Sequence, residues 1–153
     1  MPSAPDSNTL TARSCDILVI GGGPGGSTAA TLLATRGFSV TLLEKAHHPR
    51  FHIGESLLPA NLPLFDLLGV AGQVKAISMQ KFGAEFVSPW HDDPSATIHF
   101  DEAWNKDMPY SYQVRRSEFD EILLRNAGQG RGRDRRLPSA RRHLPPGWQR
   151  RRG

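Results

Sequence analysis

Six consecutive residues near the start of the chain include five glycines and could bind a phosphate group. Gly21, Gly23 and Gly26 give the spacing G-x-G-x-x-G. Glycines so spaced permit a tight turn, a close approach of the backbone to a diphosphate, and close packing of a helix on a strand. Further along the chain, the carboxylate of Glu44 could accept hydrogen bonds from ribose hydroxyls. Together they predict a dinucleotide site, although a glycine-rich turn with no ligand is the alternative.

The elements around these residues are the ones that such a site needs. Asp16 to Ile20 is a short apolar run, typical of a buried parallel strand. Gly25 to Arg36 has the small and apolar residues of a packed helix, and Gly37 is placed to end it. Phe38 to Leu43 predicts a second strand, so Glu44 stands at its end. We therefore expect an α/β fold with a Rossmann-like, FAD/NAD(P)-binding βαβ unit.

The rest of the ordered part mixes helices and strands, which we interpret as an incomplete dinucleotide-binding domain with the start of a β-rich substrate domain. Ser117 and Asp120 resemble a capping box at the start of the last helix. The expected elements are a helix over 57–68 that begins after Pro59 and stops at Gly69, strands over 81–87 and 97–101 joined as a hairpin, a strand over 110–115 and a helix over 117–127.

Composition excludes several classes of protein. The chain has 153 residues, 38% of them hydrophobic, which is enough for a folded domain. Its longest apolar run is far shorter than a membrane-spanning helix, and no secretory signal is visible. A single cysteine cannot form an internal disulfide, so we expect a reducing cytoplasm. His47, His48 and His52 lack partners at metal-ligand spacing, so we expect no metal.

The charge is divided unevenly along the chain. Residues 1–127 hold 10 Lys and Arg against 14 Asp and Glu, whereas residues 128–153 hold nine Arg and one acid. We expect a disordered leader over 1–14, an ordered part over 15–127 and a disordered basic tail over 128–153. The Arg, Gly and Pro mixture of the tail is typical of a GC-rich gene translated in the wrong frame. No aromatic residues alternate with these arginines, so a nucleic-acid partner is not expected.

Three separated segments carry a resemblance to a known group of enzymes. Asp16 to Glu44, Pro49 to Pro59 and Val114 to Asp120 resemble the N-terminal part of FAD-dependent monooxygenases. The stretch Gly-Glu-Ser-Leu-Leu-Pro within the second segment is most similar to the flavin-dependent halogenases, the tryptophan halogenase family. The geranylgeranyl reductase family is the nearby relative. The resemblance covers roughly residues 15–127.

The resemblance implies FAD as cofactor and assigns residues to it. Glu44 matches the acid that binds ribose, and Arg116 matches a cofactor-contacting arginine, with Arg115 as the neighbouring alternative. Lys45 and Arg50 lie where basic residues flank the adenosine and diphosphate end, or they are ordinary surface charges. The residues that match the diphosphate loop are Gly21, Gly23, Pro24, Gly25, Gly26 and Ser27, and those that match the loop near the flavin ring are Ile53, Gly54 and Glu55.

The same resemblance gives Lys81 a catalytic role, at the start of a strand candidate. In halogenases of this family, reduced flavin and oxygen oxidise halide to hypohalous acid, and a lysine positions or captures the halogen before it reaches an aromatic ring. Spacing alone favours a lysine at a strand edge. The implied partners are a small aromatic or electron-rich substrate and a separate NAD(P)H-dependent flavin reductase.

Complete enzymes of this kind are several times longer than one βαβ unit. We therefore expect residues 1–153 to carry the adenosine half of the cofactor site, with weak or no flavin retention and no turnover. Two other functions stay open. One is a geranylgeranyl-reductase-like or hydroxylating flavoprotein. The other is a truncated, non-catalytic nucleotide-binding module whose basic tail contacts acidic partners.

Overall fold

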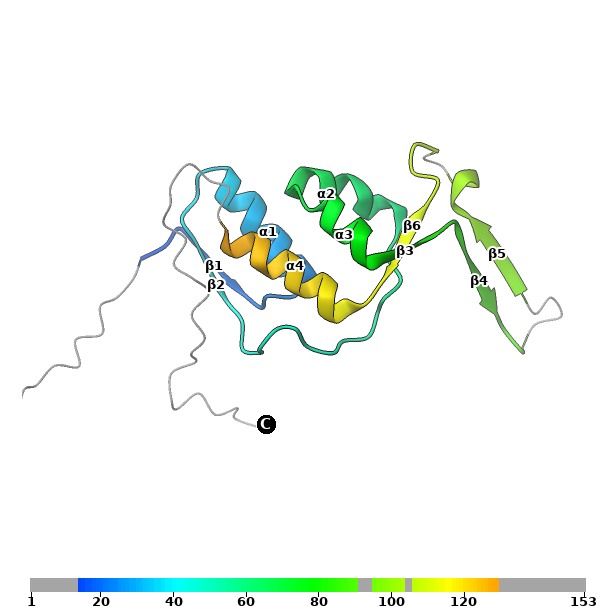
Figure 1. Cartoon of the computed structure of the whole chain (residues 1–153), viewed down its shortest axis with the longest axis horizontal. Coiled ribbons are helices and arrows are strands. Elements are labelled where there is room, and N and C mark those ends of the chain that lie inside the picture. The colour runs from blue at the N-terminus through cyan, green and yellow to red at the C-terminus, as the bar shows by residue number, and fades with distance from the viewer. Residues whose placement is uncertain (1–13, 91–94, 104–105, 130–153) are drawn as a thin grey trace, which may run out of the picture.

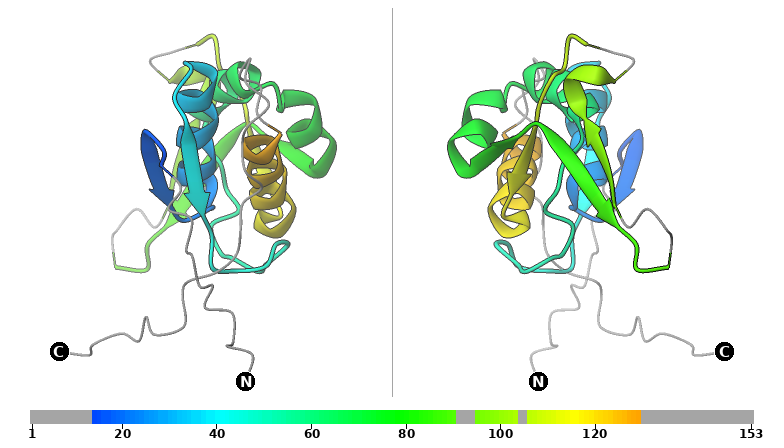
Figure 2. Two further views of the ribbon diagram at one scale, coloured as in Figure 1. Left: turned by 90° about the vertical axis from the view of Figure 1, so that its left-hand side faces the viewer. Right: turned by 90° about the vertical axis from the view of Figure 1, so that its right-hand side faces the viewer.

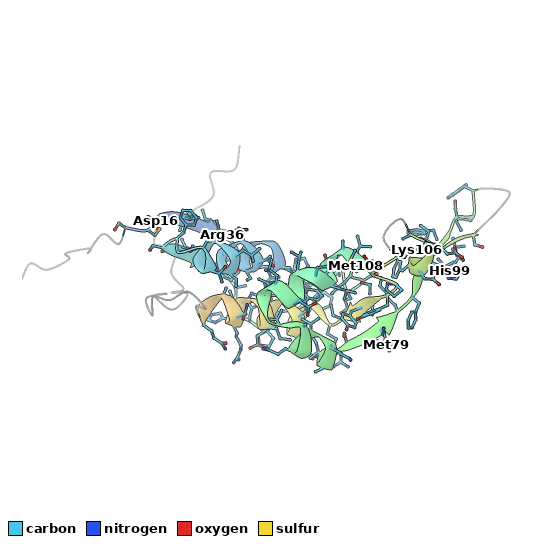
Figure 3. All side chains as sticks on the ribbon, turned by 90° about the horizontal axis from the view of Figure 1, so that it is seen from above. Asp16, Arg36, Met79, His99, Lys106 and Met108 are labelled. Atoms are coloured by element: carbon cyan, nitrogen blue, oxygen red, sulfur yellow. The ribbon has the colours of Figure 1, made fainter. Side chains whose placement is uncertain are left out.

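The computed structural model describes residues 14–90, 95–103 and 106–129. They form an elongated molecule with a parallel strand pair at one end, helices in the middle and a β-hairpin at the other end (Figure 1). Figure 3 shows the same arrangement from above, with Asp16 and His99 near opposite ends. Within the described residues, no helix is long and apolar enough to cross a membrane.

The first elements form the predicted βαβ unit. Strands β1 (Ile17–Ile20) and β2 (Val40–Leu43) pair in parallel, and helix α1 (Pro24–Thr35) connects them. Gly37 has a φ of +93°, a conformation that glycine adopts without strain, and it lets the chain turn back after the helix. The predicted fold class is therefore confirmed for this unit.

Strand β1 is covered on one face only. Ile17 and Val19 pack against the small cluster that α1 and β2 bury, whereas Leu18 and Ile20 are 53% and 81% exposed. The predicted buried strand is therefore covered on only one of its faces among the described residues, because α1 packs on a single side of the pair.

Three more helices pack in a layer beside α1. A 3-10 turn, Pro59–Asn61, leads into α2 (Leu62–Leu68), and α3 (Ala71–Ile77) follows. Helix α4 (Arg116–Gly128) lies beside α1 (Figures 1 and 2). Gly69 ends α2 as predicted, with a φ of +70°. Helix α3 was not expected from the sequence.

The predicted capping box at the start of α4 is wrong. The helix begins at Arg116, its N-cap residue is Arg115, and no side chain caps it. Asp120 is turned to Arg116 instead, where it forms an ion pair of 2.8 Å. A carboxylate four residues from an arginine has a stronger partner there than a backbone N–H.

Two antiparallel pairs complete the described fold. Strand β3 (Ser78–Lys81) pairs with β6 (Ser111–Val114), and β4 (Gly83–Val87) pairs with β5 (Ser95–His99), which a short 3-10 turn, Phe100–Glu102, follows. The predicted hairpin is confirmed, and its turn residues 91–94 lie outside the described residues.

The single strand predicted over 81–87 is wrong. The chain leaves the pair formed by β3 and enters the hairpin at Phe82, so Lys81 ends a strand and does not start one. Gly83 marks the crossing, because a Cβ there would lie 2.6 Å from the carbonyl oxygen of Ile98. The expected strand over 97–101 likewise ends at His99, where the 3-10 turn begins.

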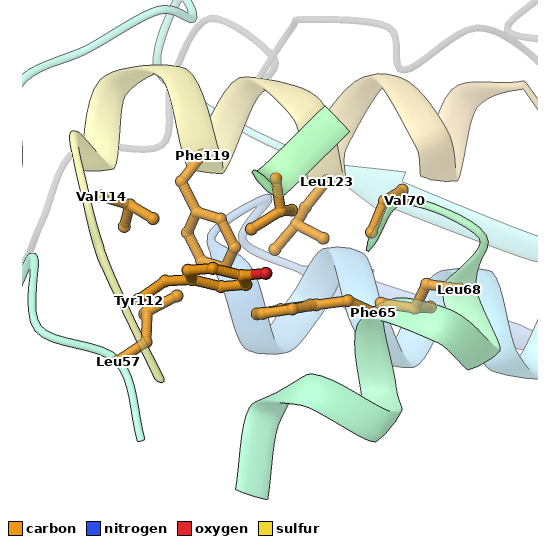
Figure 4. Packing of buried hydrophobic residues seen from close by; sticks show 9 residues of the cluster. Leu57, Phe65, Leu68, Val70, Tyr112, Val114, Phe119 and Leu123 are labelled. Atoms are coloured by element: carbon orange, nitrogen blue, oxygen red, sulfur yellow. The ribbon is translucent and has the colours of Figure 1, made fainter. Parts of the chain in front are cut away.

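The main hydrophobic core lies between α2, α3, α4 and β6. Phe65 and Phe119 meet edge to face with ring centroids 5.7 Å apart (Figure 4). The other buried members of this core are Leu57, Leu68, Val70, Val74, Tyr112, Val114 and Leu123. This core joins the segment around Leu57 to α4, and so it fixes the loop that precedes Leu57.

The expected leader and tail fall almost wholly outside the described residues. Of residues 1–14 only Ser14 is described, and of residues 128–153 only Gly128 and Gln129 are. Helix α4 runs to Gly128, one residue past its expected end. The boundaries over 15–127 stay predictions.

Candidate cofactor site and lysine cluster

The glycine loop between β1 and α1 is held close to both strands. Gly21 has a φ of +106°, and its N–H donates to the carbonyl of Leu43 at 2.7 Å. A Cβ on Gly26 would lie 1.9 Å from the carbonyl oxygen of Gly21, so only glycine fits there. The close helix–strand packing predicted for Gly26 is present.

The first turn of α1 opens onto free space. Gly23 is the N-cap residue, Pro24 follows it, and no side chain caps the helix. A Cβ on Gly25 would meet no protein atom within 4 Å. The unpaired amides of this turn, with the positive end of a 12-residue helix, therefore face a space that an anion could enter.

Ser27 faces inward. Its side chain is fully buried, and its hydroxyl donates to the carbonyl of Gly22 at 2.9 Å. The hydroxyl of Thr31 in turn donates to the carbonyl of Ser27. The Ser27 side chain thus holds the glycine loop in shape.

Glu44 points to the glycine loop. Its two carboxylate oxygens accept hydrogen bonds from the N–H of Gly22 at 2.6 Å and the N–H of Ala46 at 2.7 Å. Burial alone would raise the pKa of this carboxyl. The two amides, with the charges of Arg50 and His48, outweigh burial and hold the pKa below its ordinary value.

Arg50 lies over the glycine loop and brings positive charge to it. Its Nη2 would be 3.9 Å from a Cβ on Gly23, and its buried Nε has no hydrogen-bond partner among the described residues. Both ring nitrogens of His48 are likewise buried without such a partner. No sequence pattern placed His48 here, whereas Lys45, which the resemblance assigned to the cofactor, is exposed.

Arg116 connects α4 to the loop over 46–56. Its Nη1 donates to the carbonyl of Ile53 at 2.8 Å and, less closely, to that of Gly54 at 3.4 Å. Its Nε and Nη2 bind the two carboxylate oxygens of Asp120 at 2.8 and 3.1 Å. Arg115 is 80% exposed and pairs with Glu118. Of the two arginines, Arg116 is the one that reaches this loop.

Asp120 is a part of the site that sequence reasoning missed. Its side chain is fully buried between Arg116 and Arg50, the latter at 4.0 Å. One buried carboxylate therefore ties together the arginine at the glycine loop and the arginine at the following loop. The i to i+4 spacing of Arg116 and Asp120 was the signal available in the sequence.

The loop near the expected flavin ring has an unusual conformation. Gly54 has a φ of +90°, and a Cβ there would lie 3.2 Å from Nη1 of Arg116. The side chain of Ile53 is 74% exposed, and that of Glu55 is exposed as well. Nearby, an apolar cavity of about 530 Å³ opens between α1, α2 and α4, lined by residues that include Pro24, Gly54 and Arg116.

Lys81 belongs to a second cluster. Its Nζ donates to the hydroxyl of Ser56 and lies 5.3 Å from the centroid of the Phe100 ring. Burial lowers the pKa of its ammonium group. The structure therefore gathers the predicted residues in two groups, one at the glycine loop and one at Lys81, and residues 53–56 run between them. Among the described residues, no group of three or more His, Cys, Asp or Glu could hold a metal ion.

These features define the class of the protein as a dinucleotide-binding α/β domain with an acid at the end of its second strand. The sequence pattern of the tryptophan halogenase family matches residues 16–104, and the chain belongs to this family. Two of its relatives are described as a flavin-dependent and an FAD-dependent halogenase.

Several relatives agree with this assignment. The tryptophan 2-halogenase of Chondromyces crocatus is 52% identical over 115 residues, which cover 74% of this chain and 21% of that protein. The 1H-pyrrole-2-carbonyl-[peptidyl-carrier protein] chlorinase of Pseudomonas fluorescens is 39% identical, with 74% of this chain and 29% of that protein covered. The chain thus spans between 21% and 29% of the length of these two relatives.

The fold matches solved structures over the same region. The myxobacterial chondrochloren halogenase, described as FAD-dependent, superposes with a TM-score of 0.68 and 41% identity, covering 77% of this chain and 27% of that one. A flavin-dependent brominase superposes with a TM-score of 0.66 and 31% identity, covering 77% and 28%.

Proposed function

We propose that this chain supplies the ADP-binding half of the FAD site, and the reactive lysine, of a halogenase-like flavin monooxygenase acting on an aromatic or other electron-rich small molecule. One observation carries the proposal. The backbone N–H groups in the first turn of α1, which no side chain caps, face open space next to Arg50, and the carboxylate of Glu44 is hydrogen-bonded to the same loop. Positive charge, free amides and a ribose acceptor therefore lie together, as a dinucleotide requires.

The residues divide between the parts of the cofactor. The diphosphate would lie at the amides of Gly23 to Gly26, with the charge of Arg50 beside it. Glu44 would accept hydrogen bonds from the ribose. Each of its oxygens accepts one amide already and keeps a second lone pair for this purpose. Lys45 would lie on the adenosine side. Ile53, Gly54 and Arg116 would face the flavin side.

Bound FAD would supply the oxidising chemistry. Lys81 would act through its ammonium group, which can donate a hydrogen bond to an oxidised halogen species and hold it near the substrate. Burial and the Phe100 ring restrict where that ammonium can lie. The names of two relatives mention tryptophan and a pyrrole carbonyl group, which supports an aromatic substrate. A separate NAD(P)H-dependent flavin reductase and a cytoplasmic location complete the proposal.

Calorimetric titration of ADP and FAD into the chain tests the cofactor site. Gly25→Ala is the sharpest variant, because the added methyl group meets no protein atom and projects into the space where the diphosphate would lie. We expect the wild-type chain to bind both ligands with similar, weak affinity, and Gly25→Ala to bind at least about tenfold more weakly.

Gly72→Ala is the matched control, since Gly72 also lies in a helix with no atom within 4 Å of an added Cβ. It should bind as the wild type does. A folded wild-type chain that binds neither ADP nor FAD would overturn the proposal, as would a Gly25→Ala variant with unchanged affinity.

A further inference from the structure

We infer that Ser56 is a positioning residue for Lys81, and that its hydroxyl holds the lysine ammonium on the open face of the sheet formed by β3 and β6. The catalytic meaning of this role rests on the function proposed for Lys81 above. The contact itself, in which Nζ of Lys81 donates to the hydroxyl of Ser56, is independent of that function.

The segment that carries Ser56 pairs with β6 as a short extra strand. Ser56 forms an antiparallel bridge with Gln113. On either side of it, the N–H of Leu57 donates to the carbonyl of Tyr112, and the N–H of Val114 donates to the carbonyl of Glu55, both at 2.9 Å. The backbone of Ser56 is thus fixed by hydrogen bonds that do not involve its side chain.

The register of β3 and β6 puts Ser56 and Lys81 on one face. Gln113 lies opposite Met79 on β3, and Ser111 lies opposite Lys81. Side chains two residues apart on a strand share a face, so Lys81 shares its face with Met79, Gln113 and Ser56. Met79 is 73% exposed and Gln113 is exposed, so this face is open at those two residues, whereas Ser111, opposite Lys81, is buried.

The other face of the same strands belongs to the core. Leu57, Tyr112 and Val114 alternate with the residues above and are buried in the main cluster. Lys81 must therefore stretch diagonally across β6 to meet Ser56 on the open side. The segment of Ser56 lies on the far side of β6 from β3, two strand spacings or about 9.6 Å away, and the long side chain of Lys81 bridges this distance together with the Ser56 hydroxyl.

Two contacts of different kinds fix the ammonium group. The hydroxyl of Ser56 accepts one of its three N–H donors, and the Phe100 ring, which is 6% exposed, attracts the charge from its face. Two N–H donors are then left for a reacting species. Without Ser56, the ring alone would constrain the side chain, because an ammonium over an aromatic face can slide.

The same segment is anchored to the proposed cofactor loop. Arg116 binds the carbonyls of Ile53 and Gly54, immediately before the residues that pair with β6. A shift of that loop would move Ser56 and the lysine with it. Ser56 thus couples the flavin side of the proposed site to the reactive amine.

Carbon-13 NMR of the full chain, with lysine labelled at Cε, tests the inference without flavin or halide. The chain has four lysines, and Lys81→Met identifies the Lys81 signal by its loss. In the wild type, the ring of Phe100 should displace the ε-proton signal of Lys81 upfield from that of Lys75, which is exposed.

Three variants then separate the hydroxyl from a general effect on structure. Ser56→Ala should move the Lys81 signal toward that of Lys75, while Ser56→Thr, which keeps the hydroxyl, should retain the displacement. Ser78→Ala is the control, because Ser78 lies on the same strand and faces the other side. In the Ser78→Ala variant, the Lys81 signal should stay where it is in the wild type.

Two results would overturn the inference. One is a folded Ser56→Ala variant, with an otherwise unchanged amide spectrum, whose Lys81 signal stays where it is in the wild type. The other needs no variant: a wild-type Lys81 signal that already coincides with that of Lys75. Because neither result involves a ligand, a failure to bind FAD would refute the proposed function and leave this inference standing.

Discussion

The backbone N–H of Gly22 donates a hydrogen bond of 2.6 Å to the carboxylate of Glu44, so the acid predicted to bind ribose also holds the glycine loop. The two residues are also packed closely together, since a Cβ added to Gly22 would lie 3.0 Å from the Cβ of Glu44. Glu44 therefore connects the end of β2 to the turn before α1. Its replacement should weaken the fold as well as any nucleotide binding.

Glu44→Gln tests the structural part of this role. The amide side chain has one acceptor oxygen, so it can keep one of the two hydrogen bonds with Gly22 and Ala46. We expect the free energy of unfolding at pH 7 to fall by about 1 to 2 kcal/mol, because hydrogen bonds to charged groups are the stronger ones. Urea unfolding followed by circular dichroism measures the change.

The effect should depend on pH in a defined direction. The folded-state pKa of Glu44 lies below its ordinary value of 4.5, so its contribution is fully present above that value and is lost as the pH falls through the folded pKa. The wild type and Glu44→Gln should therefore converge in stability once the pH falls below the folded-state pKa of Glu44. The control Glu85→Gln, at an exposed strand position, should show no such convergence with the wild type. The prediction would be contradicted if the difference in stability between Glu44→Gln and the wild type stayed the same at every pH.

Gly26→Ala should prevent the βαβ unit from forming. The added Cβ would lie 1.9 Å from the carbonyl oxygen of Gly21, and a backbone atom cannot move aside as the end of a side chain can. We expect a loss of more than about 3 kcal/mol, which is enough to unfold a marginal domain. Thermal unfolding measures it. Gly72→Ala, in open space within α3, should instead raise stability by about 0.5 to 1 kcal/mol.

The sequence predicted the βαβ unit because its signals are local. An apolar run, a glycine turn, a helix and a terminal glycine follow one another without interruption. The fold around Gly21, Gly26 and Gly37 needs little beyond those residues. The hairpin of β4 and β5 was predictable for the same reason, since alternation and turn residues lie next to each other.

The missed features depend on residues far apart in the chain. Ser56 meets Lys81, and Arg116 meets Ile53, only after β6 has paired with both neighbouring segments. Nothing at Ser117 and Asp120 distinguished a capping box from an ion pair with Arg116. The break between β3 and β4 at Phe82 was also missed, because it arises where the chain changes from pairing with β6 to pairing with β5, and the local sequence pattern does not show this change.

Ser111→Ala should leave the fold at least as stable as the wild type. The Ser111 side chain is fully buried, and its hydroxyl has no hydrogen-bond partner among the described residues. Burying an unpaired hydroxyl costs about 1 to 3 kcal/mol, so its removal should raise the free energy of unfolding by about 1 kcal/mol after the small cavity is subtracted. Urea unfolding measures it, with Ser95→Ala as a variant at an exposed strand position. A clear loss of stability would show that the hydroxyl has a partner.

Asp120→Asn and Glu121→Gln form a matched pair on neighbouring positions of α4. Asp120 is fully buried and binds Arg116 through both oxygens, with Arg50 at 4.0 Å. Its neutralisation would leave two guanidinium groups that are mostly removed from water without a counter-charge. We expect a loss of about 3 kcal/mol.

Glu121 also pairs with an arginine four residues away, Arg125, at 2.6 Å, but that arginine is 73% exposed. Water screens this pair, so Glu121→Gln should cost less than about 1 kcal/mol. Urea unfolding of both variants in low and high salt tests the comparison. The loss of unfolding free energy caused by Glu121→Gln should be smaller in high salt, whereas the loss caused by Asp120→Asn should stay the same because its charges are buried. Equal losses in the two variants would mean that Asp120 does not connect the two arginines as described, and that Arg50 reaches the glycine loop without it.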